Sequence, residues 1–236
     1  MATWLDLERI GPYFALETGA VTALTGWRSL ADLKVQDAPL RARVATAHAS
    51  ISAGADGVPE RVAASAVQLG LTARLVSPAL AGAVLAALVP DLSAHRTWWS
   101  ASDTDAAPFA VPHLDVGEVV GVEETVQTLL GLVLRGSVAT LLRATLDVAG
   151  VAEQILWGNV ASALAGAGTV IGAFRPELED RCRDIVSALV ATPLLAGTGG
   201  YDRREFRRST CCLFYLAPGG GLCRDCVLAV RRSGQA

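Results

Sequence analysis

Histidine is scarce in this sequence, and its scarcity removes most hydrolytic chemistry from consideration. The three histidines, His48, His95 and His113, are scattered along a chain of 236 residues. They form no His-Glu-x-x-His pair and no Ser-His-Asp arrangement, which are the patterns that metallohydrolases and serine hydrolases use. The sequence therefore gives no support for hydrolysis.

Charged residues are also few. They make up 18% of the chain and the formal net charge is −3, so the sequence offers no basic surface for nucleic acid. Hydrophobic residues make up 52%, which is enough to bury a substantial core. The composition therefore indicates a soluble globular protein with no nucleic-acid partner.

The sequence leads us to expect neither export nor membrane insertion. Its first nine residues, Met-Ala-Thr-Trp-Leu-Asp-Leu-Glu-Arg, have neither the basic region nor the apolar stretch of a signal peptide. The longest uninterrupted apolar run, Ala79 to Val89, is well short of the ~20 residues that a membrane-spanning helix needs. We therefore expect a cytoplasmic protein with no transmembrane segment, in a compartment where thiols stay reduced.

A nucleotide-binding loop is missing as well. Gly166, Gly168 and Gly172 superficially resemble a dinucleotide fingerprint, but they close an expected helix, whereas such a loop has to follow a strand and open a helix. We interpret this segment as a helix C-terminal turn. Because no flavin or nicotinamide site is visible, redox chemistry in this protein needs an external electron donor.

Helical periodicity dominates what is present. The spacing of apolar residues, with proline and glycine as boundaries, predicts one or two short helices within Leu5 to Leu33, then helices at about 37–52, 59–77, 79–88, 123–146 with a kink or restart at Gly136-Ser137, 151–165, and from Pro176 to before Pro193. The fold class is therefore mainly α. We expect residues 1–236 to form a single helical globular domain that ends in a cysteine-rich segment at 203–230.

One stretch departs from the helical pattern. Between about residues 94 and 116, aromatic and β-branched residues flank a polar turn, which predicts a small β-hairpin insertion. Pro108 and Pro112 should confine its second strand to a sheet edge, because proline cannot donate to a ladder. Trp98 and Trp99 could line a substrate pocket, but we expect them to pack as hydrophobic side chains in the protein interior.

Four of the five cysteines lie close together near the C-terminus: Cys211, Cys212, Cys223 and Cys226. Thiolates are soft ligands that select zinc, copper(I) or iron–sulfur centres, and a Cys-x-x-Cys pair can turn both sulfurs onto one metal. The fifth cysteine, Cys182, falls within a predicted helix, and we expect it to be a packed free thiol. The C-terminal segment therefore predicts a metal site.

The vicinal pair narrows the choice of metal. Side chains of adjacent residues in extended backbone point to opposite sides, so Cys211 and Cys212 need a sharp bend to bind one ion. A dinuclear cluster relaxes that demand, and the run from Pro218 to Gly221 lets the chain fold back over it. We prefer a [2Fe–2S] centre. A structural four-cysteine zinc site and a pair of disulfides remain alternatives, although vicinal cysteines suit neither well.

The spacing Cys-Cys-x10-Cys-x2-Cys differs from that of plant-type and bacterial ferredoxins and resembles the FhuF-like ferric-siderophore reductases. The resemblance extends to the arginines before the vicinal pair, the Cys-Cys-Leu-Phe-Tyr continuation, the Pro-Gly-rich loop, and Trp157-Gly158-Asn159. In specific motifs it covers roughly the last third of the chain, and the first 120 residues match by length and helical character only.

The resemblance implies a cytoplasmic reductase. Such an enzyme holds a [2Fe–2S] cluster on all four cysteines and passes one electron to iron(III) in a siderophore, with hydroxamates favoured, which releases iron(II). A ferredoxin or a flavin-dependent reductase is the implied electron donor. Two other functions stay open: an electron carrier with no substrate of its own, and a module stapled by zinc.

Further site residues are expected around the cysteines. Arg207, Arg208 and Arg224 place positive charge beside the cluster, which would favour its reduced form and raise its potential, or else they are solvated surface arginines. Trp157 and Asn159 belong to the pattern that the resemblance covers, so we expect them near the cluster or a substrate pocket. Alternatively, Asn159 bonds to a neighbouring backbone.

Overall fold

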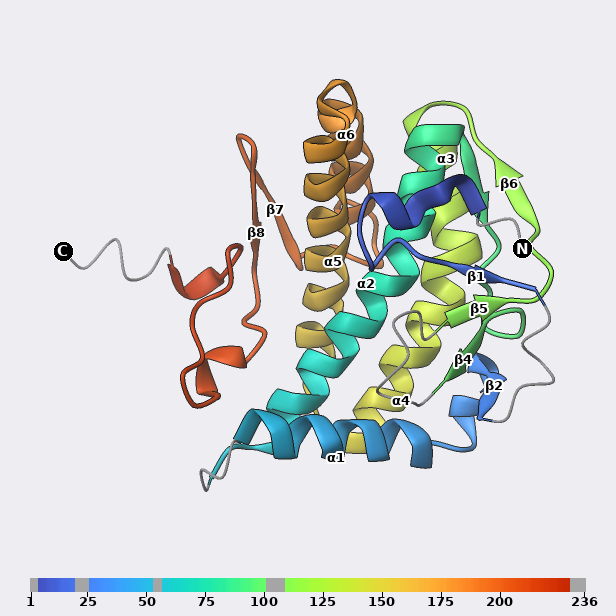
Figure 1. The fold of residues 1–236 in the computed structure, drawn as a ribbon. Helices are drawn as coiled ribbons and strands as arrows, with labels where there is room; N and C mark the ends of the chain where they lie inside the picture. The colour runs from blue at the N-terminus through green and yellow to red at the C-terminus, as the bar shows by residue number, and fades with distance from the viewer. Residues whose placement is uncertain (1–3, 20–25, 53–56, 101–108, 230–236) are drawn as a thin grey trace.

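The structure is a computed structural model, and it describes residues 4–19, 26–52, 57–100 and 109–229. Its body consists of helices that pack around α2 (Glu60–Ala86), which contacts α1 (Ala38–Ser52), α4 (Ala139–Ala149) and α5 (Glu153–Phe174). Figure 1 shows α2 crossing the middle of the molecule, with α5 and α6 (Glu179–Val190) beside it and α1 along its foot. The prediction of a mainly α fold is confirmed.

One long helical stretch reaches α4 without a break. It begins with α3 (Gly121–Leu129) and continues through a π-helical segment, η3 (Leu130–Val138). The predicted kink or restart at Gly136-Ser137 falls inside this π-helical segment. A Cβ on Gly136 would lie 3.2 Å from the Cα of Ser93, so glycine allows the close approach of the neighbouring loop here.

The remaining elements are short. They are the 3₁₀ helices η1 (Trp4–Arg9), η2 (Leu30–Lys34), η4 (Pro176–Leu178) and η5 (Phe214–Leu216), and the strands β1 (Glu17–Thr18), β2 (Trp27–Ser29), β3 (Leu88–Pro90), β4 (Trp98–Ser100), β5 (Phe109–Val111), β6 (Val116–Glu118), β7 (Gly199–Asp202) and β8 (Glu205–Arg208). The predicted short helices near the N-terminus are thus two 3₁₀ turns, and the strands β1 and β2 between them were not predicted.

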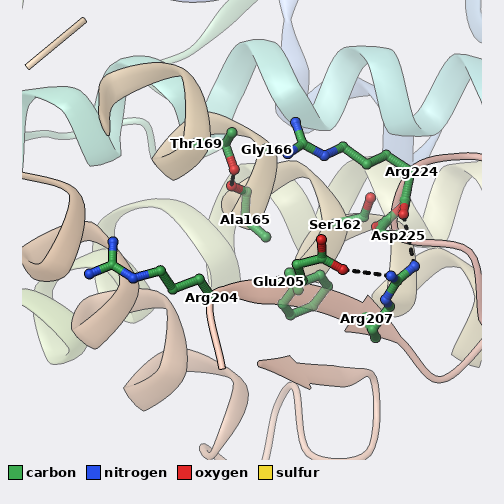
Figure 2. Close-up of a pocket in the computed structure, with 10 residues that line it drawn as sticks. Ser162, Ala165, Gly166, Thr169, Arg204, Glu205, Arg207, Arg224 and Asp225 are labelled. Atoms are coloured by element: carbon green, nitrogen blue, oxygen red, sulfur yellow. Dashed lines mark hydrogen bonds and ion pairs between the residues drawn. The ribbon is translucent and has the colours of Figure 1, made fainter. Parts of the chain in front are cut away.

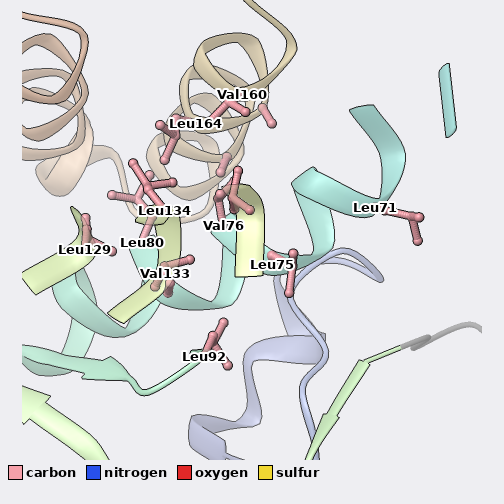
Figure 3. Close-up of a cluster of buried hydrophobic side chains, with 14 of the residues drawn as sticks. Leu71, Leu75, Val76, Leu80, Leu92, Leu129, Val133, Leu134, Val160 and Leu164 are labelled. Carbon is pink, nitrogen blue, oxygen red and sulfur yellow. The ribbon is translucent and has the colours of Figure 1, made fainter. Parts of the chain in front are cut away.

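The hydrophobic core lies where the long helices meet. Leucine and valine side chains from four elements interdigitate there, as Figure 3 shows: Leu71, Leu75, Val76 and Leu80 from α2, Leu129 from α3, Val133 and Leu134 from η3, and Val160 and Leu164 from α5. All of them are buried, and each fully buried leucine or valine stabilises the fold by about 1.5–3 kcal/mol relative to exposure.

Three helical stretches are long and apolar enough to cross a membrane, judged by length and composition alone. They are 60–86, 121–149 and 153–174, with mean hydropathies of 1.6, 1.5 and 1.4. In the most apolar 18 residues of each stretch, 67%, 61% and 61% are buried inside the protein. Much of their apolar surface is therefore packed against the rest of the protein. Scattered polar residues such as Gln68 break the runs in sequence, which is why an uninterrupted-run criterion missed them. The absence of a transmembrane segment stays a prediction.

The predicted helix break at Ser77-Pro78 is wrong, because α2 runs through Pro78 and ends only at Ala86. A proline inside a helix costs about 3 kcal/mol, since it removes a hydrogen bond and its ring crowds the preceding turn. Here Ser77, Pro78 and Ala79 are all buried in the core, so packing on both sides outweighs that cost. The helix terminates at Ala87, whose left-handed backbone (φ 58°) caps it.

The predicted C-terminal turn at Gly166 to Gly172 is also wrong, since these residues lie within α5. Two of them, Gly168 and Gly172, allow close helix packing. A Cβ on Gly168 would lie 3.3 Å from the Cβ of Cys182, and one on Gly172 would lie 3.1 Å from the Cβ of Glu179. Glycine therefore lets α5 and α6 approach closely. Cys182 itself is buried as expected, and burial raises the pKa of its thiol to about 11.

The predicted β-hairpin is confirmed, because β4 pairs antiparallel with β5 through Trp98↔Ala110 and Trp99↔Phe109. Its second strand is not at an edge, however, since the sheet order is β1-β5-β4-β2 and β5 also pairs with β1. Pro112 follows the last residue of β5, so its missing N–H is not needed by the ladder, and Pro108 lies outside the described residues. Trp99 is fully buried, as packing requires.

Gly82 provides a test of this packing. A Cβ there would lie 2.2 Å from the Cη2 of Trp4 and 2.6 Å from the backbone oxygen of Leu88. We therefore expect Gly82→Ala to lower the free energy of unfolding by about 1–3 kcal/mol, because overpacking shifts the backbone. Urea denaturation measures the change. Gly131→Ala is the matched control, since nothing lies within 4 Å of its Cβ position, and equal destabilisation by both variants would contradict this packing.

Candidate metal centre

The cysteine segment is attached to the helical body by a hairpin of β7 and β8, which lies beside α5 (Figure 1). Tyr201 and Phe206 pack edge to face across the hairpin, with ring centroids 5.3 Å apart. After β8, the backbone N–H of Ser209 donates to the carbonyl of Thr198 at 2.8 Å. The chain therefore enters the cysteine pair from a fixed direction.

Two positions bend the chain around the cysteines. Leu213 has a left-handed backbone (φ 72°), unusual for a leucine, and its N–H donates back to the Sγ of Cys211 at 3.3 Å. The chain therefore bends sharply directly after the vicinal pair. Further along, Gly219 is also left-handed, and a Cβ on Gly220 would lie 2.2 Å from the carbonyl oxygen of Phe214. The glycine run thus folds the chain back, as predicted.

The closest sulfurs belong to Cys212 and Cys223, whose Sγ atoms lie 3.1 Å apart. This contact joins one cysteine from each of the two pairs seen in the sequence. This hydrogen bond between the two sulfurs lowers the pKa of Cys212 to about 6 and raises that of Cys223. Burial raises the pKa of Cys211. A pair of close thiolates is what one iron of a dinuclear centre requires.

The described residues contain no larger cluster of metal-ligating side chains. In the part of the chain that the structure describes, no three or more His, Cys, Asp or Glu side chains lie close enough to hold one ion. Cys226 is buried, and the N–H of Leu228 donates to its Sγ at 3.4 Å, as Leu213 does to Cys211. Such N–H to sulfur bonds stabilise thiolates. Cys182, in the first turn of α6, makes no bond to any of these sulfurs among the described residues.

Asn159 is fully buried on α5 and faces the cysteine segment. Its Oδ1 accepts a hydrogen bond from the Nη2 of Arg208 at 2.6 Å. Its Nδ2 donates to the carbonyl and the hydroxyl of Ser65, both at 3.1 Å, and to the Oε1 of Gln68 at 2.9 Å. The Ser65 hydroxyl donates in turn to the backbone oxygen of Cys212 at 2.9 Å. This network ties α2, α5 and the vicinal pair together.

The neighbours of Asn159 have different roles. Gly158 allows the segment to lie against α5, since a Cβ there would be 2.1 Å from the Oγ1 of Thr210 and 3.2 Å from the Nη2 of Arg208. Trp157 packs on the core and donates to Glu153, one turn earlier, at 3.3 Å. It makes no bond to the cysteine segment among the described residues, so its place near the cluster stays a prediction.

A largely apolar cavity of about 530 Å³ opens beside the close cysteine pair. The side chains that bound it come from the N-terminal segment, α2, α5 and the cysteine segment: Tyr13, Ala66, Leu69, Gly70, Ala73, Ser162, Arg208, Cys212, Phe214, Gly221, Leu222 and Cys223. Tyr13 and Phe214 are 41% and 43% exposed, so the cavity is reached from solvent. Arg74 stacks over the Tyr13 ring at 4.2 Å from its centroid.

A second, polar recess of about 410 Å³ lies between α5 and the hairpin. Figure 2 shows Arg204, Arg207 and Arg224 around it, with Glu205 and Asp225 among them. Arg207 donates to Glu205 at 2.6 Å and to the backbone oxygen of Arg224 at 3.0 Å. Carboxylates therefore balance most of the positive charge in this recess.

The three predicted arginines thus lie at two different sites. Arg208 is 2% exposed and lies on the cavity with Cys212 and Cys223, whereas Arg207 is half-buried and Arg224 is exposed, both on the polar recess. Two of the donors of Arg208, Nε and Nη1, are buried with no acceptor. Unsatisfied buried donors on a cation indicate that an anionic group belongs beside it.

The comparison with protein families bears on this segment. Residues 208–228 match the family model described as the FhuF 2Fe-2S C-terminal domain. In these residues the chain is similar to a domain that binds a 2Fe-2S cluster. The match spans Arg208 and all four cysteines, and no curated protein matches the chain.

The residues present fit such a cluster. Four soft thiols, N–H donors aimed at two of the sulfurs, and the unsatisfied donors of Arg208 suit a group that carries net negative charge. That Cys211, Cys212, Cys223 and Cys226 are its ligands stays a prediction.

Several contributing residues were not predicted from the sequence. Ser65 and Gln68 share one buried face of α2, and polar residues three apart on an otherwise apolar helix are a signal that could have been noticed. Tyr13 and Leu69 carry no such signal, because their place on the cavity depends on how α2 packs against the C-terminal segment.

The first prediction for this site concerns the metal and its ligands. Anaerobically prepared protein should be red-brown and hold roughly two irons and two sulfides per chain, because thiolate-to-iron charge transfer absorbs visible light. Cys211→Ser, Cys212→Ser, Cys223→Ser and Cys226→Ser should each lose or weaken that absorption. Cys182→Ser is the matched control and should keep it. A colourless protein with stoichiometric zinc would overturn the assignment.

The second prediction concerns the docking of the segment on α5. Gly158→Ala should reduce the iron content of the purified protein severalfold, since the new methyl group meets Thr210 and pushes the cysteine segment off the helix. Gly166→Ala on the same helix has nothing within 4 Å of its Cβ position and should load normally. Iron analysis with circular dichroism separates a loading defect from unfolding. Full loading of Gly158→Ala would show that the close approach is not needed.

Proposed function

We propose that this protein is a cytoplasmic ferric-siderophore reductase that transfers one electron to iron(III) in a chelate, which then releases iron(II). The observation that carries the proposal is the apolar cavity bounded by Cys212 and Cys223. A protein that only carries electrons needs no such cavity, whereas a terminal reductase has to bring its acceptor close to its redox centre.

The chain's own residues supply the holding and positioning. Cys211, Cys212, Cys223 and Cys226 would bind the [2Fe–2S] cluster, and Leu213 and Leu228 donate backbone N–H groups to the outer two sulfurs. When bound, the cluster supplies one-electron transfer. The cavity walls from α2 would orient the acceptor against the cysteine pair.

The chemistry of the acceptor follows from its iron. Hard oxygen ligands hold iron(III) tightly and iron(II) weakly, so one added electron turns a trapped ion into an exchangeable one. The electron enters from an external donor, iron(III) is reduced to iron(II), and no bond to the protein is made or broken. The thiolates need a reducing compartment, which supports a cytoplasmic site of action.

The walls of the cavity favour a neutral chelate. Leu69, Ala73, Phe214 and Leu222 give it an apolar surface, and no carboxylate lines it among the residues that the structure describes. Arg208 is the one arginine on its described lining, and that side chain is buried. Three hydroxamates balance the charge of one iron(III), whereas catecholates leave a net negative charge that an apolar wall disfavours. The cavity thus supports hydroxamate siderophores as the substrate class.

An electron carrier without its own substrate is the second candidate, and one observation favours it. Phe214, Tyr215 and Leu216 follow the vicinal cysteines and are 43%, 44% and 36% exposed. Exposed aromatic residues beside a redox centre suit docking of another protein. In the reductase this patch would receive the external donor, such as a ferredoxin or a flavin-dependent reductase, and in the carrier it would serve every partner.

The two functions differ in how the rate depends on chelate concentration. Reoxidation of the chemically reduced protein by a ferric hydroxamate should saturate, with about one iron(II) trapped per electron, because a one-electron donor meets a one-electron acceptor in a bound complex. Stopped-flow absorbance and an iron(II) chelator measure both quantities. A rate that is linear to the solubility limit, and equal for unrelated iron(III) complexes, would favour the carrier.

A cavity-filling variant sharpens this test. Ala73→Phe places a ring on the cavity wall of α2 and should abolish saturation while the visible spectrum stays unchanged. Val170→Phe is the matched control, because Val170 is 41% exposed on α5 and does not line the cavity. Unchanged saturation in Ala73→Phe would show that the chelate binds elsewhere.

A further inference from the structure

Arg208 is a buried cation with no acidic partner among the described residues. It is 2% exposed, and its Nη2 donates to the Oδ1 of Asn159 at 2.6 Å and at 3.5 Å to the carbonyl of Ile155. Its Nε and Nη1 are buried with no acceptor. A charge that is withdrawn from water in this way costs more than one neutral hydrogen bond recovers.

The cysteine sulfurs that could satisfy Arg208 belong to residues that line the same cavity. Arg208, Cys212 and Cys223 all line it, and the backbone N–H of Arg208 donates to the carbonyl of Asp225, next to Cys226. Thiolates and sulfides are the anionic acceptors available here. One electron added from a reduced mediator, without a proton, would increase the negative charge that faces the guanidinium.

Asn159 fixes the guanidinium in place. Both hydrogens of its amide have acceptors on α2, at Ser65 and Gln68, so its oxygen has to face Arg208. Ser65 in turn holds the backbone of Cys212. The cation and the cysteine loop are therefore positioned by the same two helices.

We propose that Arg208 is the internal counter-ion of the [2Fe–2S] cluster, that it raises the cluster's reduction potential, and that Asn159 is the residue that positions it. Arg207 and Arg224 do not share this role, because they lie on the polar recess, where Glu205 pairs with Arg207 and solvent screens Arg224. The inference rests on the cluster-binding domain and is independent of what accepts the electron.

The test is a redox titration of the loaded protein, followed by visible absorption with dye mediators. Arg208→Gln keeps a donor for Asn159 and removes the charge. At a fixed applied potential it should lower the ratio of reduced to oxidised cluster at least tenfold, a shift of about 59 mV for one electron. Arg208→Lys keeps the charge and should stay within about threefold of wild type. Arg207→Gln and Arg224→Gln are the matched controls and should change the ratio less than about twofold.

Two outcomes would overturn the proposal: an unchanged potential in loaded Arg208→Gln, or equal shifts in Arg208→Gln and the two control variants. If Arg208→Gln does not bind the cluster, the iron content of purified Arg208→Gln is compared with that of Arg208→Lys. Loading restored in Arg208→Lys supports the need for a charge at this position, and equal loss in both variants contradicts it.

The positioning role of Asn159 has its own readout. Asn159→Ser should lower the potential in the wild-type background and leave it unchanged in the Arg208→Gln background, because its effect passes through Arg208. Equal shifts in both backgrounds would show that Asn159 acts on the structure generally. None of these measurements uses a siderophore, so a failure of chelate reduction leaves them intact.

Discussion

The hydrogen bond between Arg208 and Asn159 is the contact on which the site depends. It joins a cation at the end of β8 to an amide in the first half of α5, and the same amide donates hydrogen bonds to Ser65 and Gln68 on α2. The oxygen and the nitrogen of this amide both have buried partners, so the positions of α2 and α5 constrain each other. The network also fixes the position of the cysteine loop, because the Ser65 hydroxyl donates to the backbone oxygen of Cys212.

Small residues make that contact possible. α5 carries glycine wherever another element comes closest: Gly158 under Thr210, Gly168 against Cys182, and Gly172 against Glu179. Each glycine lowers intrinsic helix stability by about 1 kcal/mol relative to alanine. Burial of the long apolar faces of α2 and α5 against each other compensates, and it leaves a helix that two different neighbours can approach closely.

The helical body and the cysteine segment divide the work of the proposed reductase. The segment supplies soft ligands and bends sharply at Leu213 and Gly219. The body supplies the apolar wall of the cavity, from Leu69 and Ala73, and the buried polar network. Residues of both parts bound the cavity, so the docking of the segment on the helical body completes the proposed functional unit.

The sequence by itself determined the fold class, the helices outside the prolines and glycines, and the metal-binding character of the cysteines. These follow from local chemistry: apolar period, capping residues, and thiol spacing. It failed at Pro78 and at Gly166 to Gly172, where burial against other elements overrides the local preference of proline and glycine to end a helix. Only the tertiary structure decided that Cys212 meets Cys223, that Arg208 turns inward while Arg207 and Arg224 face the polar recess, and that Ser65 and Gln68 join the site. Each of these outcomes depends on residues far apart in the chain, which sequence spacing cannot bring together.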